Sequence, residues 1–190
     1  PNMKTNRALR VAVDIGGTKL CVGLVGTDAT VLWRATRATP RGSAEEIYGA
    51  LRSLIEGATA AAMAGTGPPI VCGVGCGGPM EPAGVTVSPL NIAGWRRFPL
   101  RELLERDTGL IVHVDNDAKA LALAERWTGA AVGVDNFLAM VVSTGVGGGL
   151  VVDGNLLNGR RGNAGHIGHL IVEPHGAPCA CGARGCLEAE

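Results

Sequence analysis

The chain has 190 residues, of which 46% are hydrophobic, so it is long enough to bury a sizeable core. Its 17 basic and 17 acidic residues give a formal net charge of zero, and no basic block points to nucleic acid as a partner. No apolar run is long enough for a membrane span, and residues 1–10 lack the apolar centre of a secretory signal, so we expect a cytoplasmic protein.

The first predicted elements form an antiparallel meander. Three short apolar segments predict strands, over residues 10–15, 19–25 and 31–36. The first glycine turn is not a Walker loop, because the pattern Gly-x-x-x-x-Gly-Lys-Ser/Thr does not occur. It is not a dinucleotide-binding fingerprint either, because a strand, and not a helix, follows Gly17. Ser43 and Glu46 form a capping-box pattern, which predicts a helix over residues 44–64.

The rest of the chain alternates strands and helices until residue 155, after which it is loop-like. Further strands are predicted over residues 70–74, 110–114, 136–143 and 149–153, and helices over residues 100–108 and 118–128. The stretch 80–97 is rich in proline and glycine and is predicted to be a loop. Two similar glycine-rich hairpins indicate two lobes, which we place at residues 1–117 and 118–190.

The two glycine-rich turns are candidate phosphate-binding loops. They read Asp14-Ile-Gly-Gly-Thr-Lys19 and Ser143-Thr-Gly-Val-Gly-Gly-Gly149, and each follows an apolar strand. Glycines let backbone N–H groups approach an anion, and the Asp14 carboxylate suits a hydrated Mg²⁺ ion. A single glycine-rich turn is as often a simple tight turn as a phosphate-binding loop, but two of them in one chain favour a polyphosphate ligand.

Asp115-Asn116-Asp117 stands where a predicted strand meets a predicted helix. Transfer of a phosphoryl group to an alcohol needs a carboxylate that accepts the hydroxyl proton, and Asp117 can fill that role. Asp117 can also be a helix cap, which is a common fate for an aspartate at this position. The two roles are compatible.

A metal site is predicted near the C-terminal end of the chain. One imidazole and three thiolates, from His169, Cys179, Cys181 and Cys186, make a closed tetrahedral set that suits structural zinc. The alternatives are three buried thiols or a disulfide, although a bridge between Cys179 and Cys181 would be strained. His166 and His175 compete with His169 as the fourth ligand.

Together these motifs resemble the ROK family, which contains sugar kinases and transcription repressors. The resemblance covers essentially the whole chain and rests on DIGGTK (14–19), NDA (116–118), STGVGGG (143–149), GHIGH (165–169) and CACGARGCLE (179–188). It implies an α/β fold of the actin-like, hexokinase-like (ribonuclease H-like) kind with two lobes. It also implies that ATP, Mg²⁺ and a sugar meet in the cleft of that fold, and homodimers are common in the family.

The resemblance assigns roles residue by residue. Asp117 matches the catalytic base. The sugar ligands correspond to Gly78, Asn91, Asn116, Asp117, His166, His169 and Glu188. The ATP-phosphate side corresponds to Asp14, Gly16, Gly17, Thr18, Lys19, Thr144, Gly145 and Gly147. The zinc ligands correspond to His169, Cys179, Cys181 and Cys186, with His169 binding zinc through one ring nitrogen and the sugar through the other.

Two departures from the family pattern matter. Many glucokinases of the family have Glu where this chain has His166, and the surrounding stretch instead resembles bacterial N-acetylmannosamine kinases. We therefore expect an N-acetylhexosamine substrate, with glucose as the alternative, and a sugar-sensing repressor as a less favoured function. Family members also continue beyond the position of Glu190, so we expect the second lobe to be incomplete and this stretch alone to have weak or no kinase activity.

Overall fold

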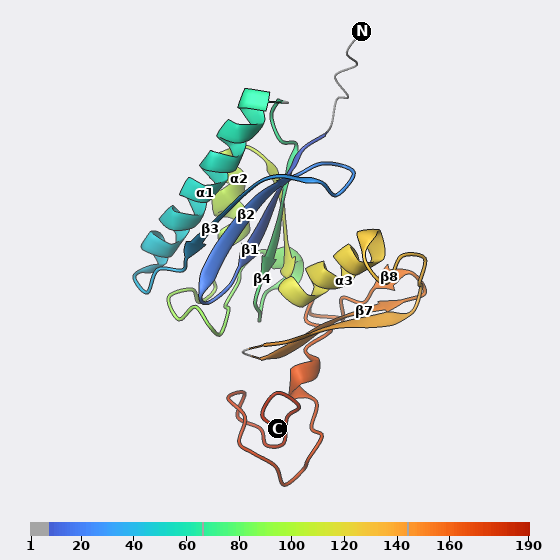
Figure 1. Ribbon diagram of the computed structural model, residues 1–190. Coiled ribbons are helices and arrows are strands. Elements are labelled where there is room, and N and C mark those ends of the chain that lie inside the picture. The colour runs from blue at the N-terminus through green and yellow to red at the C-terminus, as the bar shows by residue number, and fades with distance from the viewer. Residues whose placement is uncertain (1–7, 66, 144) are drawn as a thin grey trace. The chain divides into compact units, whose positions relative to one another are not determined.

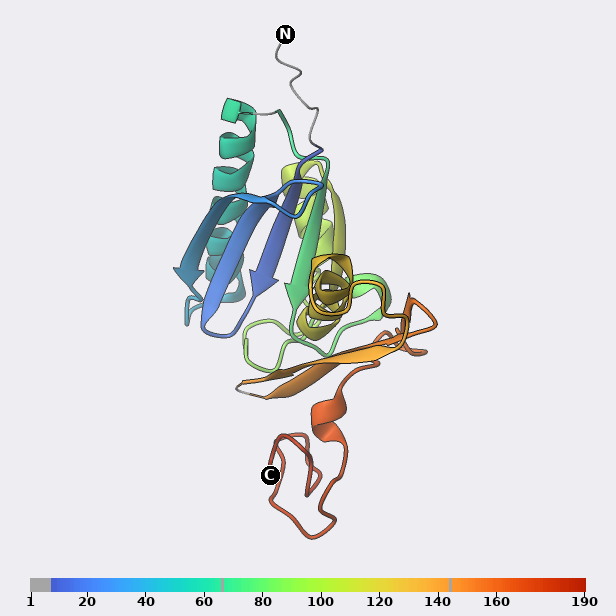
Figure 2. The ribbon, with the colours of Figure 1, turned by 45° about the vertical axis from the view of Figure 1, so that its right-hand side comes forward.

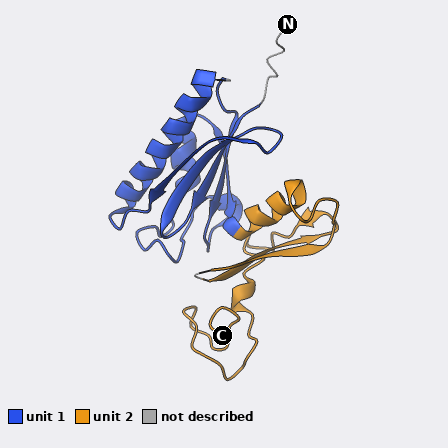
Figure 3. Ribbon diagram, in the orientation of Figure 1, with its two compact units in different colours: residues 1–117 blue, residues 118–190 orange. Residues whose placement is uncertain are grey.

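The structure is a computed structural model that describes residues 8–65, 67–143 and 145–190. The chain forms two compact units, the first ending at Asp117 and the second beginning at Ala118 (Figure 3). Each unit has its own β-sheet, and helices accompany both, so the predicted α/β class is confirmed. Among the described residues, every helix is too short or too polar to cross a bilayer.

The first unit is built on a five-stranded sheet in the order β3-β2-β1-β4-β5. Its strands are β1 (Arg10–Ile15), β2 (Lys19–Val25), β3 (Val31–Ala38), β4 (Val71–Cys76) and β5 (Ile111–Asn116). The predicted meander of β1, β2 and β3 is confirmed, and β4 and β5 run parallel to β1. Strands β4 and β5 end two residues later than predicted, because their pairing continues to Cys76 and Asn116.

The parallel strands of this sheet bring three sequence motifs to one edge. Ile15 at the end of β1 is paired with Cys76 at the end of β4, and Cys76 is paired with Asn116 at the end of β5. The carboxyl ends of parallel strands in an open sheet are the usual place for a ligand. The first glycine turn, the loop after Cys76 and residue Asp117 therefore leave the sheet side by side.

Two helices cover one face of this sheet, α1 (Ala44–Gly65) and α2 (Leu100–Thr108), as Figures 1 and 2 show. The predicted capping box starts α1: the Glu46 N–H donates to Ser43 Oγ (3.2 Å), and the Ser43 N–H donates to Glu46 Oε2 (2.7 Å). Helix α1 buries a stripe at helical spacing, made of Ile47, Leu51, Ile55, Ala58 and Ala62. Leu100 and Leu104 of α2 extend the same core.

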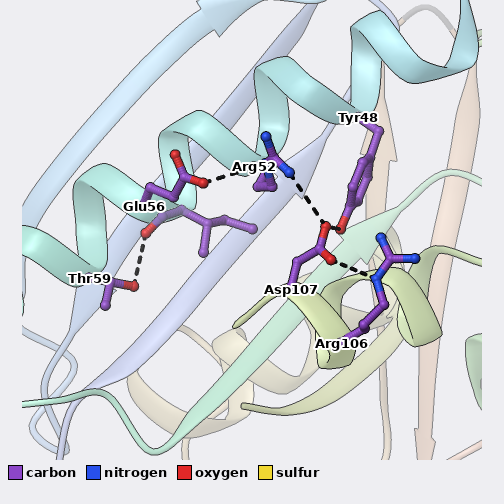
Figure 4. A network of polar contacts seen from close by, with 7 residues as sticks. Tyr48, Arg52, Glu56, Thr59, Arg106 and Asp107 are labelled. Atoms are coloured by element: carbon purple, nitrogen blue, oxygen red, sulfur yellow. Dashed lines mark hydrogen bonds and ion pairs between the residues drawn. The ribbon is translucent and has the colours of Figure 1, made fainter. Parts of the chain in front are cut away.

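A polar network joins α1 to α2 (Figure 4). The Tyr48 hydroxyl donates to Asp107 Oδ2 at 2.9 Å, and Arg106 Nε donates to Asp107 Oδ1 at 2.7 Å. These hydrogen bonds from Arg106 and Tyr48 lower the pKa of the Asp107 carboxyl, while burial and Asp107 raise the pKa of Tyr48. The network fixes the position of α2 beside α1 without enlarging the apolar core.

The predicted loop 80–97 is ordered by a buried aromatic side chain. Trp95 is fully buried, stacks on Phe98 with ring centroids 4.4 Å apart, and donates from Nε1 to the Ala44 carbonyl at 3.3 Å. The stretch also contains a short 3-10 helix, Pro82–Gly84, which was not predicted. The loop is therefore a packed element, and it holds Asn91 in a defined position.

The second unit contains most of α3 (Asp117–Thr128) and a three-stranded antiparallel sheet. The strands are β6 (Phe137–Val142), β7 (Val146–Val152) and β8 (Asn155–Leu156), and a 3-10 helix, η2, spans Ile167–His169. Neither β8 nor η2 was predicted. Gly147 and Gly148 were expected in the turn and Gly149 at the start of the strand, but all three lie in β7. The absence of side chains at Gly147 and Gly149 lets α3 pack against the strand.

Gly149→Ala is expected to lower the free energy of unfolding of the second unit by about 1–3 kcal/mol, the usual cost of overpacking. A Cβ atom at Gly149 would lie 2.5 Å from Ala122 Cβ and 2.7 Å from the Ala118 carbonyl oxygen. Gly73→Ala is the matched control, because a Cβ atom there meets no heavy atom within 4 Å. Urea unfolding followed by circular dichroism measures both variants, and equal stabilities would contradict this account of the packing.

Candidate active site and metal site

The first glycine turn, which links β1 to β2, is held by hydrogen bonds at Gly16 and exposes two of its side chains to solvent. The Gly16 N–H donates to the Lys19 carbonyl at 3.0 Å, and the Thr39 hydroxyl donates to the Gly16 carbonyl at 2.7 Å. Thr18 and Lys19 are exposed. The turn thus presents one hydroxyl group and one ammonium group to solvent, which suits an anionic ligand.

Asn91 packs directly against this turn. A Cβ atom at Gly17 would lie 2.7 Å from Asn91 Cβ, so only glycine fits there. The Gly78 carbonyl accepts a hydrogen bond from the Leu90 N–H at 3.3 Å, which ties the loop after β4 to the loop that carries Asn91. The structure therefore brings a predicted phosphate-side residue, Gly17, together with two predicted sugar-side residues, Gly78 and Asn91.

Two carboxylates, those of Asp14 and Asp117, lie at the same edge of the sheet and repel each other electrostatically. Asp14 is near the end of β1, and Asp117 is the first residue of α3, directly after β5. Although Asp14 is partly exposed, partial burial raises the pKa of its carboxyl group, and the negative charge of Asp117 raises it further. Lys19 and Arg34 act in the opposite direction. A pair of carboxylates so arranged suits a divalent cation.

Asp14→Asn is expected to raise the free energy of unfolding near neutral pH when nucleotide and magnesium are absent. The folded-state pKa of Asp14 lies above its ordinary value, so ionisation of Asp14 costs stability as the pH rises through that folded-state pKa. Below the unfolded-state pKa of about 3.9 both states are protonated, and the advantage of the variant should vanish. Urea unfolding at about pH 7 and about pH 3 tests this, and an equal advantage at both pH values would contradict it.

Asn116 and Asp117 occupy the predicted strand–helix junction. Asn116 is buried at the end of β5, and its N–H donates to Asp115 Oδ1 at 2.7 Å. Asp117 is exposed at the first position of α3. The junction therefore positions an accessible carboxylate on a rigid element, as a general base requires.

The second glycine turn joins β6 to β7 in the second unit. The Ser143 N–H donates to the Gly145 carbonyl at 2.9 Å, and Thr144 lies outside the described residues. Gly147 is in β7, where an added Cβ atom would lie 3.2 Å from Ala118 Cβ. Packing against α3 thus accounts for Gly147, whereas Gly145 remains a residue of the turn.

His166, His169 and Glu188 form one group in the second unit. The His169 N–H donates to the His166 carbonyl at 3.2 Å, and the two rings are edge to face with centroids 6.5 Å apart. The Glu188 N–H donates to the Gly168 carbonyl at 3.0 Å, which places Glu188 Oε1 at 3.4 Å from His169 Nδ1. All three sugar ligands predicted for residues 118–190 are therefore neighbours.

Glu188 also contacts the second glycine turn, which the sequence did not indicate. Its Oε2 accepts a hydrogen bond from the Val146 N–H at 3.3 Å, and a Cβ atom at Gly145 would lie 3.0 Å from the same oxygen. The side chain thus links the predicted phosphate turn to the histidine group within the second unit.

The four predicted metal ligands lie together. One ligand atom from each of His169, Cys179, Cys181 and Cys186 lies within 4.8 Å of the others. Cys179 Sγ is 3.8 Å from His169 Nδ1, and Cys181 Sγ is 3.7 Å from Cys186 Sγ. In a tetrahedral site with Zn–S bonds of about 2.3 Å, two sulfur atoms are about 3.8 Å apart. The residues present therefore fit zinc.

The structure does not show the disulfide that was one alternative for this cluster. All six cysteines are within the described residues, and none forms a disulfide. Among the described residues the metal-binding group includes His169 and neither of its predicted competitors, His166 and His175. Left-handed backbone at Gly182 (φ 93°) and Gly185 (φ 67°) makes the tight turn that brings the thiols together.

Comparison with known proteins places the chain in context. The sequence profile described as the ROK family matches residues 10–190. The chain is 40% identical over 183 residues to a glucokinase of Thermotoga maritima, covering 94% of this chain and 56% of that protein. It is 38% identical to an N-acetylmannosamine kinase of Yersinia pestis, covering 94% of this chain and 59% of the relative.

The fold comparison agrees. The structure matches a ROK family glucokinase from Streptomyces griseus, solved in complex with glucose and AMPPNP, with a TM-score of 0.81 and 39% identity. The match covers 95% of this chain and 56% of that one. The chain thus spans somewhat more than half the length of these three relatives.

Proposed function

The chain belongs to the ROK family, and from that membership we propose that the protein transfers the γ-phosphoryl group of ATP to a hydroxyl group of a sugar. The proposal rests on one observation, namely which groups lie at the edge of the sheet where β1, β4 and β5 end. That edge brings together the first glycine turn, Asn91 and the two carboxylates of Asp14 and Asp117. Phosphoryl transfer requires little else from a protein than positioning, charge stabilisation and a base.

Each group at the edge has a proposed role. Asp117 accepts the proton of the sugar hydroxyl as it attacks, and Asn116 and Asn91 orient the sugar by hydrogen bonds, with Gly78 in the adjoining loop. Asp14 holds hydrated Mg²⁺, which offsets phosphate charge. The first turn would bind phosphate through Gly16, Gly17, Thr18 and Lys19. In the second unit, Thr144 and Gly145 are the proposed phosphate ligands.

Zinc has a structural role in this proposal. His169 Nδ1 and the thiolates of Cys179, Cys181 and Cys186 would hold it, which leaves no ligand position for water. When bound, zinc would make this segment rigid, because it joins four side chains. A liganded imidazole also keeps one ring nitrogen for another partner. His169 can then contact the sugar through Nε2, next to His166 and Glu188.

The proposed sugar is N-acetylmannosamine or a related N-acetylhexosamine. His166 carries this choice, because a neutral imidazole can donate to or accept from an acetamido group, whereas a carboxylate can only accept. Glucose is the second candidate, since relatives of similar identity are named glucokinase. Both kinds of relative therefore support a sugar kinase more firmly than they support one sugar.

A coupled assay of ADP release tests the proposal with ATP and Mg²⁺ against N-acetylmannosamine, N-acetylglucosamine and glucose. The expected result is turnover with at least one sugar and the highest kcat/KM with an N-acetylhexosamine. Highest kcat/KM with glucose would reject the choice based on His166 and keep the kinase. No turnover with any of the three would count against the kinase itself.

A further inference from the structure

Lys119 is a buried cation in the second unit, and no motif of the sequence singles it out. It lies on α3 with 1% of its surface exposed, among Ala118 and Ala122 on the buried side of that helix. An ammonium group in such a place is strongly unfavourable unless hydrogen bonds replace water. Lys119 Nζ donates to Asn158 Oδ1 at 3.0 Å and to the Gly162 carbonyl at 2.7 Å. Both acceptors belong to one loop, residues 157–165.

The interior of the 157–165 loop is held by short-range backbone hydrogen bonds, from the Ala164 N–H to the Asn158 carbonyl (3.1 Å) and from the Gly162 N–H to the Gly159 carbonyl (3.3 Å), and by the contacts from Lys119, which come from outside the loop. Its ends are fixed to β7, because the Leu157 N–H donates to the Leu150 carbonyl (2.8 Å) and the Gly148 N–H donates to the Gly165 carbonyl (2.8 Å). Between these ends, residues 157–161 are exposed. Three of the loop's nine residues are glycines with left-handed backbone, namely Gly159, Gly162 and Gly165. Glycine-rich backbone is costly to order, so the contacts from Lys119 matter for its conformation.

The residue that follows this loop is His166. The Gly165 carbonyl also accepts a hydrogen bond from the Ile167 N–H at 2.7 Å, so the loop end and η2 form one continuous backbone structure. A change in the conformation of residues 158–164 would therefore be transmitted to the start of η2. His166 and His169 are the side chains placed there.

We propose that Lys119 is a positioning residue for sugar binding, in that its ammonium group holds the 157–165 loop and thereby fixes His166. The effect of Lys119 on sugar binding rests on the proposed function, whereas the effect of Lys119 on the loop does not depend on that function. Lys119 touches neither sugar nor phosphate in this role. Suppose that only the ordered loop binds sugar. A fall in the population of the ordered conformation to about a tenth then raises the apparent Kd of the sugar about tenfold.

Lys119→Met tests the proposal, because methionine keeps an unbranched apolar stem and removes the donors. We expect the sugar KM to rise by about tenfold or more, while the ATP KM stays within about twofold. Hydrogen exchange of the free protein is expected to accelerate for residues 158–169 and to stay unchanged in β1–β5. Asn158→Ala, at an exposed residue, should give a smaller change in the same direction and add little to Lys119→Met, because both remove the same contact.

Arg160→Met is the matched control, since it removes a cation from an exposed position of the same loop. It is expected to leave the sugar KM and the exchange pattern close to those of the unaltered protein. An unchanged sugar KM in Lys119→Met, or a uniform rise of both KM values with exchange accelerated throughout, would overturn the proposal. If the unaltered protein phosphorylates no sugar, the proposed function has failed, and the exchange of residues 158–169 alone decides whether Lys119 positions the loop.

Discussion

Asp117→Asn is expected to lower kcat for sugar phosphorylation by roughly 10²–10⁴-fold, while the sugar KM stays within about threefold. The amide has almost the same shape as the carboxylate and can hydrogen-bond to a sugar hydroxyl, but it cannot accept the proton. Asparagine caps helices about as well as aspartate, so α3, which begins at residue 117, should form normally. Steady-state kinetics with the best sugar of the screen measures the separation between kcat and KM.

The same substitution has an effect that does not depend on turnover. The negative charge of Asp117 contributes to the raised pKa of Asp14, so its removal is expected to lower the pKa of Asp14. Carbon-13 NMR of labelled aspartate carboxyl groups follows that titration directly. A pKa of Asp14 that is the same in both proteins would show that the two carboxylates do not interact.

Asp153→Asn is the control for this pair of measurements. Asp153 is exposed in the turn between β7 and β8 and has a φ of 48°, a conformation that asparagine tolerates well. Asp153→Asn removes one negative charge at a residue that has no role in the proposed reaction, so kcat should be close to that of the unaltered protein. Full activity in Asp117→Asn, beside an unaffected control, would remove Asp117 as the base.

The sequence predicted those parts of the molecule whose cause is local. Ser43 and Glu46 of the capping box are only three positions apart, and the β1–β3 meander follows from short turns between apolar segments. The thiols of Cys179, Cys181 and Cys186 lie within eight residues, so their grouping also could be predicted. The strand–helix junction at Asn116 and Asp117 was found for the same reason.

The features that the sequence did not reveal depend on contacts between distant residues. Gly147 and Gly149 must be glycine because α3 packs against them, and that requirement cannot be read from the run of glycines itself. Glu188 contacts Val146, 42 residues earlier, and Lys119 contacts Gly162, 43 residues later. A lysine between alanines on an apolar helix face was the only available sign of the second contact, and helices often carry such lysines at their surface.

Cys186→Ser is expected to abolish stoichiometric zinc binding and to unfold the segment after η2 locally. Residues 170–190 contain no regular helix or strand, and two isolated bridges, Ile171 with Cys186 and Pro178 with Arg184, organise them. Leu170, Ile171 and Val172 are exposed, so apolar burial contributes little to order there. Structural zinc binding is worth about 10–16 kcal/mol near neutral pH, which makes the metal the main source of order in such a segment.

Three measurements test this expectation together. Atomic emission should find about one zinc per chain in the unaltered protein and almost none in Cys186→Ser. Hydrogen exchange should accelerate in residues 170–190 of the variant, and a chelator should produce the same pattern in the unaltered protein. The α1 and α2 core should be unchanged in both, because it lies in the first unit.

Cys21→Ser separates loss of the metal from loss of any thiol. Cys21 is half-buried in β2 and accepts hydrogen bonds from Arg34 Nε (3.2 Å) and the Thr36 hydroxyl (3.5 Å), which a serine oxygen can also accept. Its zinc content and exchange should match the unaltered protein. Since η2 and Glu188 adjoin the metal ligands, sugar binding should weaken in Cys186→Ser and not in Cys21→Ser. A Cys186→Ser protein that keeps its zinc, or residues 170–190 that stay protected after chelation, would refute the structural role assigned to the metal.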